Sequence, residues 1–362
     1  MKKTMLLVMI LTLGTVMGIA RADFTFGPAT NLGDIVNSPS GDFEPCVSPD
    51  GVSLYFASTR SGGAGNEDIW VTTRTRMRAT MEEVWASPTN LGSLVNNQYW
   101  DRDPCVSADG LTLYFESSRP NGTNNYPHIY ISTRHTTEDP WGPAQNLGQV
   151  NRECGGPCIS ADGLSLFMHS DRPGSIGPVD LYVATRPSPS DDWGFWTSTE
   201  NLGEPVNSTA LDRSPYVSSD GRVLFFNSNR SGGIGGQDIW MTIRETEGNT
   251  WRKPVNLGPE INTLSNDAGP CISADGRTLY FHSNRPGGFG DNDLWQAPII
   301  PIVDFSGDGT VDAVDMCIMV DFWGTNEPLC DIGPMPWGDG VVDMQDLTVL
   351  AEHLFEEVPV QP

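Results

Sequence analysis

A fivefold internal repeat constrains the fold of this chain more than any other feature of its sequence. The triplet Asn-Leu-Gly recurs at intervals of 55 to 59 residues. Self-similarity at such a period is typical of arrays in which each repeat is one supersecondary unit. The five copies begin at Asn31, Asn90, Asn146, Asn201 and Asn256.

Two further signals lie at fixed places in each repeat. The first is Ser-x-Asp-Gly followed by an alternating apolar run, which predicts a tight hairpin between two short strands. The second is an arginine followed by a glycine-rich stretch and then an aspartate; in the first repeat the arginine is Arg60 and the aspartate is Asp68. We expect the arginine and the aspartate to form a structural ion pair in each repeat. The turn aspartates are Asp50, Asp109, Asp162, Asp220 and Asp275.

Each repeat is therefore predicted to contain four antiparallel strands, the last of which carries Asn-Leu-Gly. Four such strands make a propeller blade, because radial stacking buries both faces of each small sheet. No outer strand follows Trp295, whereas an unmatched one occupies residues 26–33. We expect an all-β, five-bladed β-propeller over residues 23–299, closed into a ring by its N-terminal strand.

The repeats resemble a known family. Residues 44–56, which read Glu-Pro-Cys-Val-Ser-Pro-Asp-Gly-Val-Ser-Leu-Tyr-Phe, are similar to the TolB-type, WD-like β-propeller repeat. The resemblance covers all five blades and implies the fold, but it does not imply one activity, since such propellers serve as docking platforms, as parts of peptidases and as other exported proteins. Tyr216 and His128 depart from the pattern of the other blades.

The C-terminal stretch has a different composition. Thirteen carboxylates and no Lys or Arg lie between residues 304 and 362, which favours a bound cation. Oxygen ligands at positions 1, 3, 5, 9 and 12 of a loop, with glycine at position 6, are typical of a calcium loop. The first site would use Asp304, Ser306, Asp308, Asp312 and Asp315, with the backbone carbonyl of Thr310.

A second, altered loop follows, with Asp331, Asp339, Asp343 and Asp346 as its candidate ligands. Because Asp331 precedes Asp339 by more residues than Asp304 precedes Asp308, we expect a weaker or differently built site. The duplicated loop and helix resemble a type I dockerin over residues 304–358, after a linker at 300–303. The resemblance implies an EF-hand-like α-helical module that binds calcium and docks to a cohesin-like partner; a calcium-stabilised cap without a cohesin is the alternative.

Residues 1–22 match a secretory signal peptide. Lys2 and Lys3 precede an apolar run, and cleavage after Ala22 would follow small residues. The run is too short and too rich in glycine for a membrane span. Loss of this segment takes the formal net charge from −25 to about −28, a charge that repels nucleic acid and anionic membranes. We expect a secreted or cell-surface protein.

Six of the seven cysteines divide into two groups, and Cys154 belongs to neither. Four of them occupy one inner-strand position of different blades, where buried thiols acting as small apolar fillers are the expected role: these are Cys46, Cys105, Cys158 and Cys271. Cys317 and Cys330 flank the first helix of the C-terminal module, and the sequence leaves open whether they form a disulfide.

The start of the inner strand and the end of the second strand should meet at the channel mouth, since they run antiparallel. Polar residues that differ between blades are the candidate ligand contacts. They are Glu44, Asp103, Glu153, Asp212 and Asp267 from inner strands, with Glu116, His169 and His282 from second strands.

We favour a non-catalytic binding or scaffold protein whose propeller binds a glycan or protein. The alternative is a polysaccharide-active glycoside hydrolase that carries a dockerin, with two carboxylates at the mouth as acid and base. No hydrolase signature or phosphate loop is present in the sequence. A deep pocket between two carboxylates would favour the enzyme, whereas a shallow mouth filled by side chains would favour binding.

Overall fold

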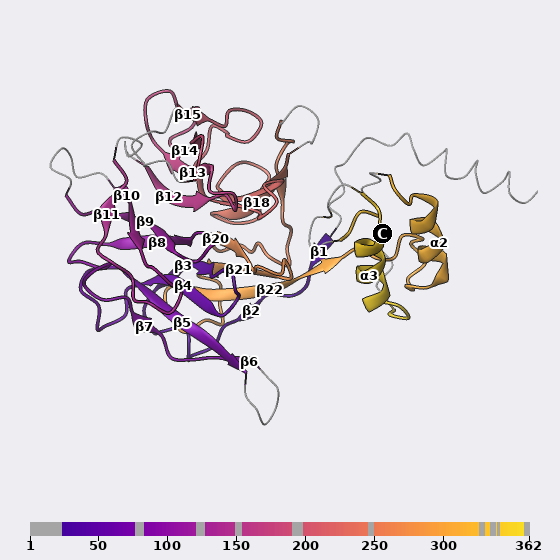
Figure 1. Ribbon diagram of the computed structural model, residues 1–362, viewed down its shortest axis with the longest axis horizontal. Helices are drawn as coiled ribbons and strands as arrows, with labels where there is room; N and C mark the ends of the chain where they lie inside the picture. Colours follow the sequence, from indigo (N-terminus) through magenta and orange to yellow (C-terminus); the bar gives the residue numbers. More distant parts are fainter. Residues whose placement is uncertain are drawn as a thin grey trace, which may run out of the picture. The chain divides into compact units, whose positions relative to one another are not determined.

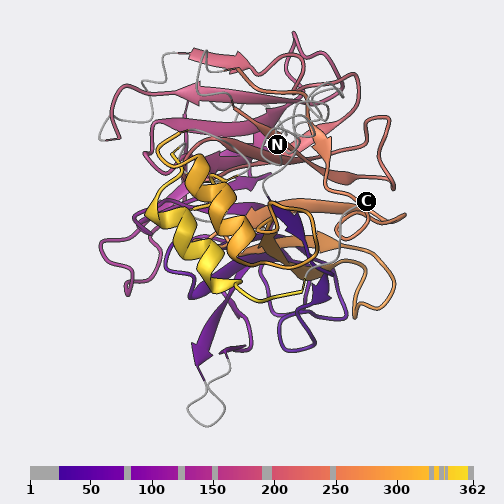
Figure 2. The same ribbon diagram turned by 90° about the vertical axis from the view of Figure 1, so that its right-hand side faces the viewer.

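The computed structural model describes residues 24–76, 83–120, 127–148, 154–189, 198–244, 250–325, 330–333, 338 and 341–357. The predicted signal peptide at residues 1–22 lies outside this part of the chain. The chain divides into a large unit of residues 26–300 and a small unit that includes residues 301–357 (Figures 1 and 2). None of the described helices is long and apolar enough to cross a membrane.

Five antiparallel sheets form the large unit, which confirms the five-bladed propeller. Blade one contains β3 (Asp42–Val47), β4 (Ser53–Ser58), β5 (Asp68–Arg76), β6 (Glu83–Trp85) and β7 (Thr89–Asn90), and blade two contains β8 (Asp101–Val106), β9 (Thr112–Ser117), β10 (His128–Thr133) and β11 (Gln145–Asn146). Blade three contains β12 (Cys154–Ile159), β13 (Ser165–Ser170), β14 (Asp180–Thr185) and β15 (Ser198–Asn201), and blade four contains β16 (Asp212–Val217), β17 (Val223–Ser228), β18 (Asp238–Ile243) and β19 (Val255–Asn256). Blade five contains β20 (Asp267–Ile272), β21 (Thr278–Ser283) and β22 (Asp293–Pro301), joined by β1 (Phe24–Phe26) and β2 (Thr30–Asn31) from the N-terminal end.

The N-terminal segment completes the fifth blade, as predicted. β2 pairs with β22, with Asn31 opposite Trp295. The Asn37 side chain adds two bonds to the same strand: its Oδ1 accepts the amide of Leu294 at 2.8 Å, and its Nδ2 donates to the Leu294 carbonyl at 3.1 Å. The two ends of the repeat array are therefore joined, and the outer edge of β22 is covered.

The Ser-x-Asp-Gly signals form the predicted hairpin turns. In the first blade the Ser48 hydroxyl donates to Asp50 at 2.5 Å, and Gly51 has φ of +71°, a conformation that favours glycine. The predicted pairing of Arg60 with Asp68 is wrong. Arg60 contacts Asp42 of the inner strand at 2.6 Å, because the Asp68 carboxylate is already held by backbone amides of the preceding loop.

The small unit contains two short helices, α2 (Ala313–Asp321) and α3 (Met344–Glu352), which pack on a shared core (Figure 2). Each helix begins with a capping box, at Asp312 and at Asp343. On α2, Met319 is fully buried in this core, whereas Val314 is 49% exposed. Cys317 and Cys330 are not bonded to each other: Cys317 is exposed and Cys330 lies in the core.

Candidate ligand site at the propeller mouth

One backbone position of each inner strand builds the mouth. It lies in a β-bulge before a proline and has a left-handed conformation in every blade, with φ of +53° at Glu44, +49° at Asp103 and +47° at Ser214. Gly156 and Gly269 occupy the position in the other two blades. Non-glycine residues in this region are strained, and such strain gathers at functional sites.

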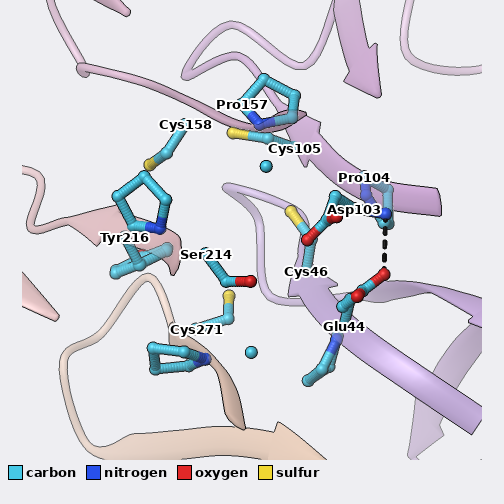
Figure 3. A pocket seen from close by; sticks show the side chains of 15 residues that line it. Glu44, Cys46, Asp103, Pro104, Cys105, Pro157, Cys158, Ser214, Tyr216 and Cys271 are labelled. Carbon is cyan, nitrogen blue, oxygen red and sulfur yellow. Dashed lines mark hydrogen bonds between the residues drawn. The ribbon is translucent and has the colours of Figure 1, made fainter. Parts of the chain in front are cut away.

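This register corrects part of the predicted mouth. Asp212 and Asp267 lie two residues before the bulge position, where they are fully buried and paired with Arg230 and Arg285 at 2.5 and 2.6 Å. The prediction mixed two registers because blades one and two carry acidic residues at both positions. Glu153 lies outside the described residues. Of the predicted inner-strand carboxylates, Glu44 and Asp103 therefore line the mouth (Figure 3).

The second-strand residues join neighbouring blades. His282 Nδ1 accepts the amide of Glu44 at 3.1 Å, and His169 Nδ1 accepts the amide of Ser214 at 3.4 Å. Burial lowers the pKa of each histidine to about 4, so both are neutral near pH 7 and their Nδ1 atoms are free to accept. These two side chains hold the bulges in place and do not form an open ligand surface.

Glu116 has the same joining role in the second blade. Its Oε2 accepts the amide of Gly156 at 3.0 Å, and its side chain is fully buried. Ala57 holds this position in the first blade and has no acceptor atom, so the neighbouring amide of Asp103 is bound instead by Glu44 Oε2 at 3.0 Å (Figure 3). The mouth is therefore asymmetric, with its polar groups concentrated between blades one and two.

Arg102 is the centre of this polar group, and it is not among the residues predicted from the sequence. Its Nη2 lies 3.0 Å from Glu116 Oε1, and its Nε lies 3.8 Å from Asp103 Oδ2. The guanidinium also stacks over the Trp100 ring, at 4.2 Å from the centroid. The available signal was a basic residue between two acidic ones in the inner strand, Asp101 and Asp103.

The carboxylates around Arg102 have unlike pKa values. Burial raises the pKa of Glu44 to about 7 against the attraction of Arg102. Burial and the charge of Glu44 also raise the pKa of Asp103 well above its usual value. Burial would raise the pKa of Glu116 as well, but the charges of Arg102 and His169 and the hydrogen bonds from Asp103 and Arg102 together outweigh burial, and the pKa is lowered. The site therefore holds one firmly ionised carboxylate and two that accept protons readily.

The raised pKa of Glu44 predicts a pH-dependent stability. The folded state binds this proton more tightly than the unfolded state, so the contribution is full below the usual pKa of 4.5 and is lost as the pH rises through about 7. Glu44→Gln keeps an acceptor for the Asp103 amide and cannot ionise. Between about pH 5 and about pH 8, we expect its unfolding free energy to gain about 1 to 3 kcal/mol relative to wild type. Denaturant titrations measure this, and parallel pH profiles would contradict it.

The cavity at the mouth is shallow. Its volume is about 40 Å³, and its floor is made by Cys46, Cys105, Cys158, Cys271 and Tyr216 (Figure 3). This space holds about one water molecule and no sugar ring. A ligand would therefore lie on the rim, against the partly buried side chains of Arg102, Glu44 and Glu67, the last of which lies 3.9 Å from Arg102.

The first acidic loop of the small unit is tightly organised around two carboxylates. Asp304 accepts the amides of Gly307 at 2.7 Å and Gly309 at 2.9 Å, and Asp315 accepts the amides of Ser306 at 2.9 Å and Asp312 at 2.8 Å. Partial burial alone would raise the pKa of Asp304, but the hydrogen bonds from these amides outweigh burial, so the pKa lies below its usual value. The φ of +90° at Gly309 is the sharp turn that such a loop needs at its sixth position.

The second loop repeats these contacts across an insertion. Asp346 accepts the amides of Gly333 at 2.7 Å and of Asp343 at 2.6 Å, as Asp315 does for Ser306 and Asp312. Gly333 thus matches the third loop position, and Asp331 matches the first position held by Asp304. Asp339 lies outside the described residues.

The two halves of the small unit are also tied by matching backbone bonds. Val311 pairs with Phe355 and Glu356 beyond α3, and Val342 pairs with Gly324 and Thr325 beyond α2. In the described part of the chain, no three His, Cys, Asp or Glu side chains are grouped to hold a metal ion. The donors in the first loop are nevertheless all oxygens of the kind that hard cations take, and Asp308 is exposed.

Comparisons with known proteins give fold similarity alone. No protein-family model and no curated protein matches the chain. The TolB structure from Acinetobacter baumannii is 16% identical with a TM-score of 0.45, over 73% of this chain and 56% of TolB. A GH43_1 enzyme from Xanthomonas citri, solved with xylotriose, is 14% identical with a TM-score of 0.49, over 75% and 89%. An alpha-L-arabinofuranosidase from Lactobacillus brevis is 14% identical with a TM-score of 0.48, over 75% and 94%.

The class of the protein rests on its own blades: it is an all-β, five-bladed propeller followed by a small unit with two helices.

Proposed function

We propose that this chain is an exported, non-catalytic binding or scaffold protein whose propeller mouth engages a glycan or a protein. The observation that carries the proposal is that the mouth carboxylates are already bonded to groups within the fold. Glu116 is buried against Arg102 and the Gly156 amide, and Glu44 binds the Asp103 amide. With a cavity of about 40 Å³, these groups support contact with a ligand on the rim more than enclosure of a reacting sugar.

We propose further that the small unit is dockerin-like and binds calcium. Asp304, Ser306, Asp308, Thr310, Asp312 and Asp315 would hold the first ion, and Asp331, Asp339, Asp343 and Asp346 the second. Calcium would neutralise the crowded carboxylates and fix the loops. Apolar side chains on this unit remain exposed, among them Trp323 at 43%, Val320 at 58% and Phe355 at 84%, which supports docking to a cohesin-like domain.

The hydrolase alternative has one specific observation in its favour. The unlike pKa values of Glu44 and Glu116 resemble those of an acid and a base pushed apart by their environments. Glu116, however, has no exposed surface from which to reach a substrate. The binding proposal therefore ranks first.

Binding to a panel of immobilised polysaccharides, with assay of released reducing sugar, tests the proposal. We expect binding without hydrolysis, and a loss of about tenfold in affinity, or about 1.4 kcal/mol, for Asp103→Asn. Asp109→Asn is the matched control, because Asp109 lies in an exposed turn that binds Ser107. Sugar release by the wild type that disappears in Glu44→Gln would replace the binding proposal with the hydrolase.

A further inference from the structure

A larger cavity lies at the opposite end of the inner strands from the mouth, at the interface of blades five and one. Its volume is about 440 Å³, against about 40 Å³ at the mouth. Ordinary small-molecule sites measure about 300 to 1,000 Å³, so this cavity has the size of a ligand site. The hairpin turns of both blades line it through Asp50 and Asp275, together with Arg74 and Tyr280.

A polar pair joins the two blades at this cavity. Arg74 of the first blade donates through Nη2 to the Tyr280 hydroxyl of the fifth, and its guanidinium stacks over the Trp85 ring at 4.5 Å from the centroid. Burial raises the pKa of Tyr280, so the phenol keeps its proton near pH 7. Because its oxygen accepts from Arg74, the hydroxyl can donate that proton to a ligand.

Aromatic rings pack the corresponding place at two other blade interfaces. Trp141 meets Tyr55 edge-on between blades one and two, with ring centroids 6.1 Å apart, and Trp251 meets Phe167 between blades three and four at 6.4 Å. Trp85 is the equivalent tryptophan at the interface of blades five and one, since each of the three lies under an arginine. Among the described residues, its ring has no such contact with the neighbouring blade, which accounts for the space there.

The two turn aspartates use one carboxylate oxygen each in their hairpins. Asp275 Oδ1 accepts the Ser273 hydroxyl at 2.5 Å and the Arg277 amide at 3.0 Å. Asp50 Oδ1 makes the equivalent two bonds in the first blade. Oδ2 takes no part in these bonds in either residue, so the cavity offers acceptors at both turns beside the donors of Arg74 and Tyr280.

We propose that this cavity binds a neutral mono- or disaccharide, at a site separate from the mouth. A sugar hydroxyl both donates and accepts, which suits a cavity that combines carboxylate acceptors with phenol and guanidinium donors. An anionic ligand would meet two carboxylates, and a cationic one would meet Arg74. Val47 and Val52 add apolar surface for the C–H face of a ring. The site uses no residue of the mouth and does not depend on the proposed function.

Saturation-transfer NMR titrations of the full-length protein with D-glucose, D-xylose and cellobiose test the proposal, with glucuronate and glucosamine as charged counterparts of glucose. We expect a neutral sugar to bind, and Asp275→Asn to weaken it about tenfold or more, because Oδ2 becomes a donor while Oδ1 keeps the hairpin bonds. Asp162→Asn is the matched control, at the same turn position of blade three and outside the cavity. Absence of binding by all three neutral sugars, equal weakening by both variants, or tighter binding of either charged sugar than of glucose would overturn the proposal.

A second pair of variants isolates the phenol hydroxyl and separates this site from the mouth. Tyr280→Phe keeps the ring and removes the hydroxyl, so we expect sugar binding about fivefold weaker. Tyr55→Phe removes the equivalent hydroxyl in blade one, where the ring packs on Trp141, and should leave binding unchanged. Asp103→Asn alters the mouth alone and should also leave it unchanged. Binding that is lost in Asp103→Asn and kept in Tyr280→Phe would place the sugar at the mouth and reject this site.

Discussion

Deletion of residues 23–33 is expected to make the protein aggregate and unfold at a clearly lower temperature. The deletion removes β2 and the Asn31 side chain, which bonds to Asp293 at 2.8 Å across the closure of the ring. The outer edge of β22 would then present unpaired N–H and C=O groups, which are a template for pairing with another chain. Size-exclusion chromatography and a thermal melt measure the effect, and a monomer with an unchanged melting temperature would contradict it.

Two point variants separate ring closure from ordinary loss of a buried side chain. Asn37→Ala leaves the N–H of Leu294 without its acceptor, which costs about 1 to 3 kcal/mol for one buried group, while the Leu294 carbonyl keeps the Leu32 amide at 3.1 Å. Asn96→Ala removes the same pair of bonds from Ile69, but inside the first blade and away from the closure. We expect similar losses of stability in both variants and oligomers only in Asn37→Ala, because only that variant loosens the N-terminal strand.

The blades could be predicted from the sequence because the repeated residues are the ones that the architecture uses. Asn31 joins the Asp293 carboxylate, the Gly33 amide and the Asn37 side chain, so the triplet recurs wherever an outer strand meets its blade. The aspartate that this asparagine contacts, Asp293 here, recurs in the blades for the same reason. The partner of the repeated arginine could not be predicted, because two repeated aspartates, Asp42 and Asp68 in the first blade, are candidates for Arg60 and spacing alone does not distinguish them.

The mouth was predicted only in part. A bulge shifts the inner strand by one position, and Asp42 and Glu44 are both acidic, so the sequence could not tell the buried ion pair from the mouth residue. Variation between blades at the second-strand position does not mark ligand contacts either. His282 and Glu116 differ in type but accept equivalent backbone amides, those of Glu44 and Gly156, so the variation reflects alternative acceptors and not ligand contacts.

The predicted order of a loop and then a helix, repeated once, agrees with α2 and α3, because each helix begins at an aspartate that caps it, Asp312 or Asp343. Loop residues were harder to align, since an insertion separates Asp331 from the rest of the second loop. The contacts of Asp346 resolve this register, because its carboxylate binds the Gly333 amide as Asp315 binds that of Ser306. By this correspondence Asp331 holds the first position of the second loop, as Asp304 does in the first loop.

Removal of calcium is expected to unfold the small unit and leave the propeller intact. The acidic stretch carries thirteen carboxylates without a Lys or Arg, so its compact state is self-repelling until a divalent ion neutralises the loops. When free calcium is about 100-fold above Kd, binding adds about 2.7 kcal/mol of stability, which is a large share for a core this small. The two compact units have separate cores, so the loss should not spread to the blades.

Hydrogen exchange of the full chain, with calcium and with a chelator, measures this unit by unit. We expect chelation to remove protection from α2 and α3 and to leave β3 and β4 unchanged. Asp308→Ala should abolish the tighter site, and Asp346→Ala should affect a weaker one. Asp321→Asn is the matched control, since Asp321 is an exposed carboxylate at the end of α2, outside both loops. Equal protection of α2 and α3 in calcium and in chelator would end the calcium proposal, because a cation that fixes these loops must change their exchange.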